Sequence, residues 1–208
     1  RDRWTAPDGD FIDVDWLELY GNIIGDRSFP SALKAYFLRV DEQPMDRGYS
    51  VWYPELVVAR DRLMRAVNER YRDQLLENFR ELDTYRWEGS PKDGIEDRLL
   101  KQVLLDLIVM DDSAESHQLI LDHMAAATTA TDRVAALLAL NRSASPRRHA
   151  VLEEVYKSWR THLSGYANYL RIISSGTQDD VFAMIACEKE RPSFDITQPT
   201  WCRALFLP

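Results

Sequence analysis

Hydrophobic residues recur along much of this chain at steps of three, four or seven positions, the spacing that lines one face of an α-helix. The longest stripe lies within residues 54–83 and extends over about eight helical turns. It consists of Leu56, Leu63, Val67, Tyr71, Leu75, Phe79 and Leu82. Shorter stripes with the same spacing follow in the second half of the chain. No segment sustains an alternation of apolar and polar residues, so we expect helices and no β-sheet.

Residues that favour helix starts separate these stripes. Asp112, Thr129 and Thr177 are each followed by an acidic residue three positions later. The side-chain oxygen of the first residue can accept a hydrogen bond from a backbone amide of the first helical turn, and the acid lies near the positive end of the helix dipole. Pro91 and Pro146 each follow a serine and suit the first helical position. Together these patterns predict ten helices, over residues 13–24, 29–40, 54–83, 95–110, 114–127, 131–142, 147–163, 166–175, 178–187 and 199–206.

Helices that follow one another through short turns favour antiparallel neighbours. The predicted fold is therefore all-α, a superhelical solenoid or bundle of about ten antiparallel helices of the HEAT or ARM type. A chain of 208 residues can bury a sizeable core, and we expect a single domain over residues 1–208. The loops at 41–53 and 84–94 are the candidate hinges.

The charge balance narrows the range of partners. Lys and Arg number 26 against 34 Asp and Glu, which gives a formal net charge of -8. Nucleic acid and anionic membranes both need a concentrated basic surface, so we expect neither as a partner. The best apolar run, Val103 to Met110, contains Asp106 and is far shorter than the roughly 20 residues of a membrane-spanning helix.

The two cysteines, Cys187 and Cys202, lie fifteen positions apart and fit neither a disulfide framework nor a thiolate metal site. We therefore expect reduced thiols and a cytoplasmic location. The chain starts at Arg1 with neither an initiator methionine nor an apolar secretory segment, and we expect it to be a piece of a larger protein.

A search for catalytic chemistry finds no constellation. The four histidines, His117, His123, His149 and His162, lack the spacing of a helical zinc site, and we expect them on helix surfaces. A nucleophile elbow, a Gly-rich phosphate loop and a CxxC pair are all absent from the sequence. Neighbouring acids on a helix point about 100° apart and do not converge, so we expect caps or solvated faces for the pairs 111–112, 153–154 and 179–180. For the aromatic residues Tyr49, Trp52 and Tyr53 we favour a role in the core, or in a hydrophobic staple at the start of the long helix, over a ligand-binding role.

Three segments of the last third carry a family resemblance. They are Thr131-Asp-Arg-Val-Ala-Ala-Leu137, Val151-Leu-Glu-Glu-Val-Tyr-Lys-Ser-Trp159 and Phe194-Asp-Ile-Thr-Gln-Pro-Thr-Trp-Cys-Arg-Ala-Leu-Phe206. In this order the chain resembles the C-terminal helical domain of the aminopeptidase N (membrane alanyl aminopeptidase) family of zinc metallopeptidases. There the segments read approximately MTDRLAAL, LxxFYxxW and FDxxNPNRxRxLxxxF. The similarity extends through 31–83, is least secure over 1–28, and implies that the domain continues past residue 208.

The resemblance implies a parent enzyme that removes N-terminal amino acids from peptides. Its zinc is held by HExxH and a downstream Glu, and GxMEN binds the substrate's amine; both motifs are absent from this chain. We therefore expect a fragment with no catalytic residue, metal ligand or cofactor of its own. Its partners would be the upstream catalytic domain of the same polypeptide and the parent's peptide substrate.

In that family the helical domain closes over the active-site chamber and restricts access to small peptides. Its NPNRxR segment lies towards the chamber, which makes Arg203 the candidate chamber-facing or interface residue; an ordinary helix-surface arginine is the alternative. The chain departs from the pattern at 198–200, where Gln-Pro-Thr replaces Asn-Pro-Asn, and at 167–170, where Ala-Asn-Tyr-Leu replaces Asp-Lys-Trp-Phe.

Two other functions remain open at this point. The chain could be a free-standing helical-repeat scaffold that binds another protein along a concave face. It could also be an independent enzyme whose site follows no recognised pattern. A longer native polypeptide with the zinc motifs upstream would favour the aminopeptidase interpretation.

Overall fold

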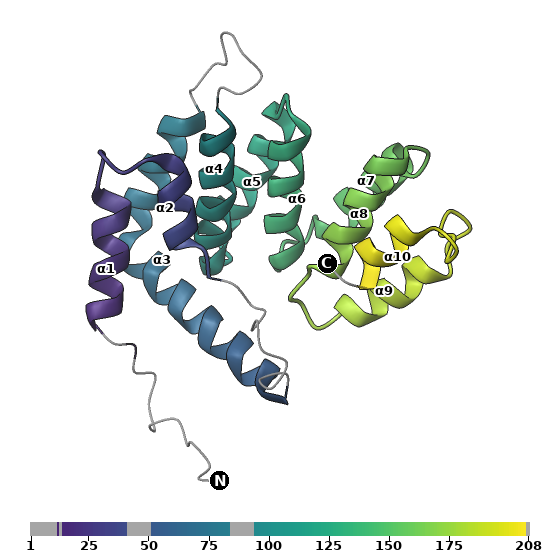
Figure 1. Cartoon of the computed structure of the whole chain (residues 1–208), viewed down its shortest axis with the longest axis horizontal. Coiled ribbons are helices and arrows are strands. Elements are labelled where there is room, and N and C mark those ends of the chain that lie inside the picture. Colours follow the sequence, from purple (N-terminus) through teal and green to yellow (C-terminus); the bar gives the residue numbers. More distant parts are fainter. Residues whose placement is uncertain (1–11, 13, 41–50, 84–93, 207–208) are drawn as a thin grey trace. The chain divides into compact units, whose positions relative to one another are not determined.

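The computed structural model describes residue 12 and residues 14–40, 51–83 and 94–206. Within these residues the chain forms ten α-helices and the short 3₁₀ helix η2, with no strand, so the all-α prediction is confirmed (Figure 1). The helices belong to two compact units, Arg1–Asp111 and Asp112–Pro208. A single domain over 1–208 stays a prediction. Most of both candidate hinge loops, together with Tyr49 and Pro91, lies outside the described residues.

The first unit is built around one long helix. Its elements are α1 (Val14–Gly25), α2 (Ser31–Leu38), α3 (Tyr53–Asp83), α4 (Ile95–Ile108) and η2 (Val109–Asp111). α4 and α1 pack on α3, and α2 packs on α1 and α4 (Figure 1). The predicted stripe of α3 supplies Val67, Leu75 and Phe79 to the core. The start of α3 is different, because Trp52 and Leu56 are exposed; the core role expected for Trp52 is wrong.

α3 bends where it meets α1. Tyr71 has a backbone conformation outside the helical range, with φ of -124° and ψ of 18°. The ring of Tyr71 lies against Gly21, where an added Cβ would stand only 2.4 Å from the ring. A glycine at this position of α1 therefore provides the space that the tyrosine ring occupies.

The second unit is arranged around α8. Its helices are α5 (Ala114–Ala126), α6 (Ala130–Arg142), α7 (Arg148–Trp159), α8 (Leu163–Ser174), α9 (Val181–Lys189) and α10 (Pro199–Phe206). α6, α7, α9 and α10 all pack on α8, while α5 packs on α6. Tyr166, Tyr169 and Leu170 of α8 are almost fully buried, so this helix contributes large side chains to the core of the unit.

The predicted cap at Thr129 is confirmed, and the cap predicted at Asp112 lies one residue further along the chain. The Ser113 hydroxyl accepts a hydrogen bond from the Ser116 amide at 3.1 Å, and Thr129 accepts one from the Asp132 amide at 3.2 Å. The cap of α5 is thus Ser113, one residue after the predicted Asp112. Each cap satisfies an amide that the helix itself leaves without a partner.

Three predicted boundaries of the second unit differ from the structure. The helix expected over 147–163 ends at Trp159, and α8 begins at Leu163, before the predicted 166. The helix expected from 178 begins at Val181, and Thr177 does not cap it. The Gln178 side chain instead donates to the Arg142 carbonyl at 2.7 Å. Packing against the end of α6 therefore holds this segment as a turn.

Buried asparagines close helix ends in both units. Asn68 of α3 donates through Nδ2 to the carbonyls of Leu107 and Ile108, at 3.0 and 3.1 Å, at the end of α4. Asn141 of α6 donates in the same way to Ile172 and Ile173, at 2.7 and 3.3 Å, near the end of α8. The last carbonyls of a helix have no partner within it, so these amides satisfy groups that packing has removed from water.

None of the described helices combines the length and the apolar character that crossing a bilayer requires. The longest, α3, is rich in charged residues along its 31 positions.

Candidate functional site

Arg203, the residue singled out by the sequence, lies on the exposed side of α10. The opposite side of that helix is anchored on α8. The Trp201 ring meets the Tyr166 ring edge to face with centroids 5.1 Å apart, and Trp201 Nε1 donates to the Leu163 carbonyl at 3.3 Å. Leu205 is 1% exposed. The Arg203 side chain thus extends from a firmly packed helix.

A cluster of charged and aromatic side chains joins α7, α8 and α9. We call it the Arg191 cluster; it comprises Glu153, Tyr156, Tyr169, Glu188 and Arg191. Arg191 bonds to Glu153 through Nη2 and to Glu188 through Nε, each at 2.7 Å. Its guanidinium carbon also lies 3.8 Å from the centre of the Tyr156 ring, a cation–π contact. One arginine after α9 therefore connects α7 to α9.

Glu188 is the buried member of the Arg191 cluster, at 3% exposed. Its Oε1 accepts from the Tyr169 hydroxyl at 2.7 Å and from Arg191. Its Oε2 is buried without a hydrogen-bond partner among the described residues. Burial raises the pKa of Glu188, since a charged carboxylate is poorly solvated there. The hydrogen bond from Arg191 lowers the pKa of Glu153.

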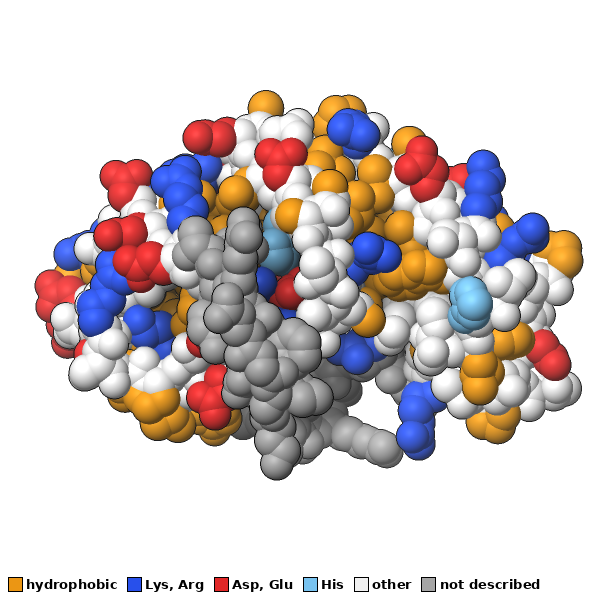
Figure 2. All heavy atoms as spheres, turned by 90° about the horizontal axis from the view of Figure 1, so that it is seen from above, with side chains coloured by type: hydrophobic (Ala, Val, Ile, Leu, Met, Phe, Trp, Pro, Cys, Tyr) orange, Lys and Arg blue, Asp and Glu red, His pale blue; other side chains and the backbone are white. Residues whose placement is uncertain are grey.

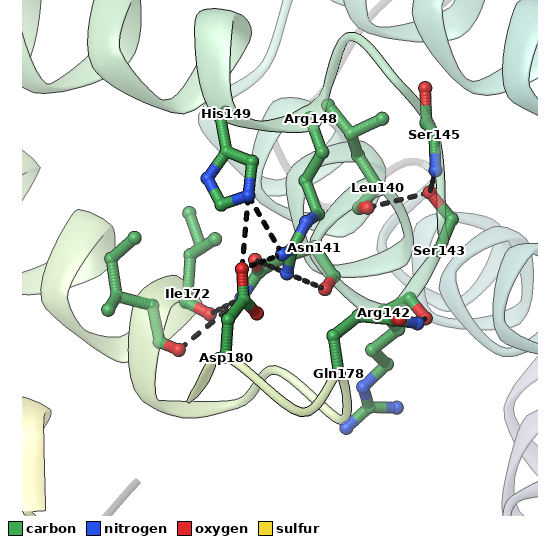
Figure 3. A network of polar contacts seen from close by, with 11 residues as sticks. Leu140, Asn141, Arg142, Ser143, Ser145, Arg148, His149, Ile172, Gln178 and Asp180 are labelled. Atoms are coloured by element: carbon green, nitrogen blue, oxygen red, sulfur yellow. Dashed lines mark hydrogen bonds and ion pairs between the residues drawn. The ribbon is translucent and has the colours of Figure 1, made fainter. Parts of the chain in front are cut away.

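A second polar network holds α6, α7 and the segment before α9 together (Figure 3). Arg148 is 5% exposed and donates through Nη1 to the backbone and side-chain oxygens of Asn141, at 3.2 and 3.3 Å. Its Nη2 forms an ion pair with Asp180. His149 Nε2 lies 3.0 Å from the same Asp180 oxygen (Figure 3). The hydrogen bond from Arg148 lowers the pKa of Asp180.

Both networks were missed by sequence reasoning. The acidic pairs were expected to cap helices or face water, yet one member of each of two pairs, Glu153 and Asp180, bonds to a buried or partly buried arginine. Adjacent acids do diverge on a helix, but one of them can still meet a cation from a distant element. Arg191 carries no local signal. The VYKSW segment, which contains Tyr156, was the nearest pointer to this cluster.

The histidines do not converge on a metal site. Within the described ranges, no group of three or more His, Cys, Asp or Glu side chains is placed to hold an ion. His117 lies 2.6 Å from Asp112 and His149 lies 3.0 Å from Asp180. Each pair therefore supplies one histidine and one acid to a metal ion, which is too few ligands for a zinc site. The zinc that the resemblance implies for the parent enzyme therefore does not fit these residues. His123 is 4% exposed, so a surface position for it is wrong; packing of α5 on α6 encloses it.

The two cysteines are free thiols, with Cys187 exposed and Cys202 partly buried. The side chains of the two polar networks pair with one another, and Arg148 and Glu188 do so in buried positions. They connect elements of the unit, whereas Arg203 extends from an anchored helix and is exposed.

Comparisons with known proteins agree with the helical fold described above. A family model described as a domain of unknown function, DUF3458_C, with ARM repeats matches residues 6–208. Among solved structures, the crystal structure of Legionella pneumophila aminopeptidase A in complex with aspartic acid is similar, with a TM-score of 0.78 and 15% sequence identity. The match covers 94% of this chain and 24% of that one. No curated protein matches in sequence. The predicted HEAT- or ARM-like helical-repeat class is confirmed.

Proposed function

Since the chain belongs to the DUF3458_C family of ARM-repeat domains, a C-terminal domain of aminopeptidases, we propose that it is the non-catalytic C-terminal part of an aminopeptidase N-like zinc exopeptidase. The parent would remove N-terminal amino acids from peptides in the cytoplasm. One observation carries the proposal: the structural match takes in nearly all of this chain but only 24% of the Legionella enzyme. Zinc and the catalytic residues would belong to the upstream part of the same polypeptide.

The role proposed for the helical domain is to close over the active-site chamber and to admit only peptides that fit. Buried polar networks connect the helices of the second unit, and breaking a buried charge pair is costly, so this unit would keep its shape as one side of the chamber. Arg203 would present its guanidinium towards the chamber. A guanidinium offers two parallel donors that match a carboxylate, so it would bind the C-terminal carboxylate of a short peptide.

The test uses the full-length polypeptide and pairs of substrates. Tripeptides carry a C-terminal carboxylate, whereas aminoacyl-arylamides have none. Arg203→Ala should raise KM for tripeptides by about 10-fold, since a hydrogen bond to a charged group contributes roughly 1.5 kcal/mol or more, and should leave arylamide hydrolysis unchanged. Arg147→Ala, another exposed arginine of the same unit, is the matched control. Equal losses on both substrates would refute the carboxylate role.

Removing residues 1–208 from the full-length enzyme tests the closing role. If the domain restricts access, the truncated enzyme should gain activity on long peptides relative to short ones. An unchanged preference for length would contradict the proposal.

The free-standing scaffold is the alternative, and repeat surfaces of this class are common binding surfaces. The mass of the native polypeptide distinguishes the two. A product several times heavier than 24.2 kDa that cleaves arylamides supports the peptidase domain, and a native product near this mass supports the scaffold.

A further inference from the structure

α2 has the reverse of the usual distribution of polar and apolar residues. Its single charged residue, Lys34, is 4% exposed, while Leu33, Tyr36 and Phe37 are 48%, 74% and 50% exposed. These three apolar positions have i, i+3, i+4 spacing and form one stripe on the outer side of the helix. A surface helix normally turns such a stripe towards the core, so this outer stripe requires a second partner.

The inner side of α2 is fixed by specific bonds. Lys34 Nζ donates to the Ile24 carbonyl at the end of α1, at 3.2 Å, and to Asn78 Oδ1 of α3, at 3.3 Å. Ser31 Oγ donates to Asp97 of α4 at 2.6 Å. Turning the helix to hide its aromatic stripe would break these bonds. The exposure of the stripe is therefore built into the packing of this unit.

The neighbouring helix also exposes apolar side chains. α1 packs beside α2 and exposes Trp16 and Leu19, at 58% and 47%, with i, i+3 spacing. We call the outward residues of the two helices the α1–α2 patch; its members are Trp16, Leu19, Leu33, Tyr36 and Phe37. At about 200 Å² for a whole aromatic side chain, these exposed fractions leave on the order of 500 Å² of apolar surface open. Hydrophobic side chains also reach the surface between charged ones in Figure 2.

The exposed apolar area summed over these five side chains is comparable with the largest apolar patch of a typical monomer. It is more than half of the roughly 800 Å² that each partner contributes to a standard protein interface. Because Lys34 is buried and bonds to Ile24 and Asn78 inside the unit, the stripe of α2 offers apolar and aromatic contacts rather than charge. Its partner must present an apolar surface.

We propose that the α1–α2 patch is the surface on which the preceding part of the parent polypeptide docks. The inference rests on the proposed function, in which the remainder of the enzyme lies upstream of residue 1. The structural match leaves about three-quarters of the Legionella chain outside this domain, which is ample for such a partner. α1 begins at Val14, so the segment that joins it to the preceding part can span at most about 45 Å. Chain continuity keeps that part near this patch.

The experiment places a photoreactive benzoylphenylalanine at Tyr36 in the full-length polypeptide. A large aromatic side chain at a 74% exposed position should leave the unit folded. Phe182 of α9, which is 79% exposed in the other unit, carries the same group as a matched control. After irradiation, cross-linked peptides are identified by mass spectrometry of a mixture of isotopically light and heavy protein.

The expected result is a cross-link from position 36 to peptides that precede residue 1 of the same molecule, which position 182 does not share. Mixed light–heavy products, which identify a second copy, would overturn the proposal. So would links confined to residues 1–208, no links, or identical upstream links from both positions. The double variant Tyr36→Asp, Phe37→Asp should also speed proteolytic separation of the domain at least 10-fold, against less than 2-fold for Phe182→Asp.

Aminopeptidase activity is measured on the same preparations, so the two proposals fail separately. An upstream cross-link in an inactive polypeptide retains the docking surface and refutes only the peptidase function. An active enzyme without that cross-link retains the function and refutes the docking surface.

Discussion

Replacing Arg148 with methionine should be among the most damaging single changes in the second unit. The guanidinium is 5% exposed and joins three groups: the backbone oxygen of Asn141, the side-chain oxygen of the same residue, and the Asp180 carboxylate. Methionine keeps a long flexible side chain that can fill the space. It donates no hydrogen bond, so all three oxygens lose a partner at once (Figure 3).

The magnitude follows from how far each oxygen is removed from water. Removing one partner of a buried ion pair costs about 3–5 kcal/mol. The Asp180 side chain is 35% exposed and can recover part of its solvation, which reduces its share. Asn141 is fully buried, so its oxygens cannot recover theirs. We therefore expect a loss of about 2–4 kcal/mol in the free energy of unfolding.

Urea unfolding followed by circular dichroism measures this loss. Arg147→Met is the matched control: its side chain is exposed, and it should change stability by less than ~0.5 kcal/mol. A double-mutant cycle with Asp180→Asn then isolates the ion pair from the two bonds to Asn141. If Arg148→Met and Arg147→Met unfold at the same urea concentration, the argument that this buried network stabilises the unit is refuted.

Three further outcomes are expected. Gly21→Ala should destabilise the first unit by about 1–2 kcal/mol in thermal unfolding, because the new methyl group meets the Tyr71 ring. Gly25→Ala is the control: an added Cβ there has no neighbouring atom within 4 Å, so the change should be neutral or stabilising. Asn68→Leu should cost about 2–4 kcal/mol, since two buried carbonyls lose their donor, and hydrogen exchange at the end of α4 should speed up. The raised pKa of Glu188 means that the folded state binds the proton of this carboxyl more tightly than the unfolded state does. The free energy of unfolding should therefore fall as pH rises from about 4.3 through the raised pKa. Glu188→Gln should remove this fall, and a variant with the same pH profile as the original protein would contradict the role of Glu188.

Much of the architecture could be predicted because helices are specified locally. The stripe in residues 54–83 and the capping residues Ser113 and Thr129 act within one or two turns. The family resemblance came from the same helical segments and is confirmed by the family match. Where a local signal predicted a helix boundary wrongly, hydrogen bonds to another helix hold the segment in a different conformation. Thr177 does not start a helix because its neighbours Gln178 and Asp180 are bonded to α6 and α7.

The site was harder to predict than the helices. Arg203 was found through a resemblance, and its exposed position on an anchored helix is compatible with a ligand; its role stays a prediction. The Arg191 cluster gathers residues from α7, α8, α9 and the segment after α9. No spacing along the chain could have identified the whole cluster, because its members come from three helices and the segment after α9.

The amino-acid sequence by itself determined that this protein is a series of helices, where most of them begin and end, and to which family they belong. The tertiary structure alone decided which charges are buried. Lys34, Arg148 and Glu188 look like surface residues in the sequence, yet each is at most 5% exposed. The physical reason is that a helix forms from bonds between residues four apart, whereas a charge can leave water only where packing brings partners from other helices to meet it.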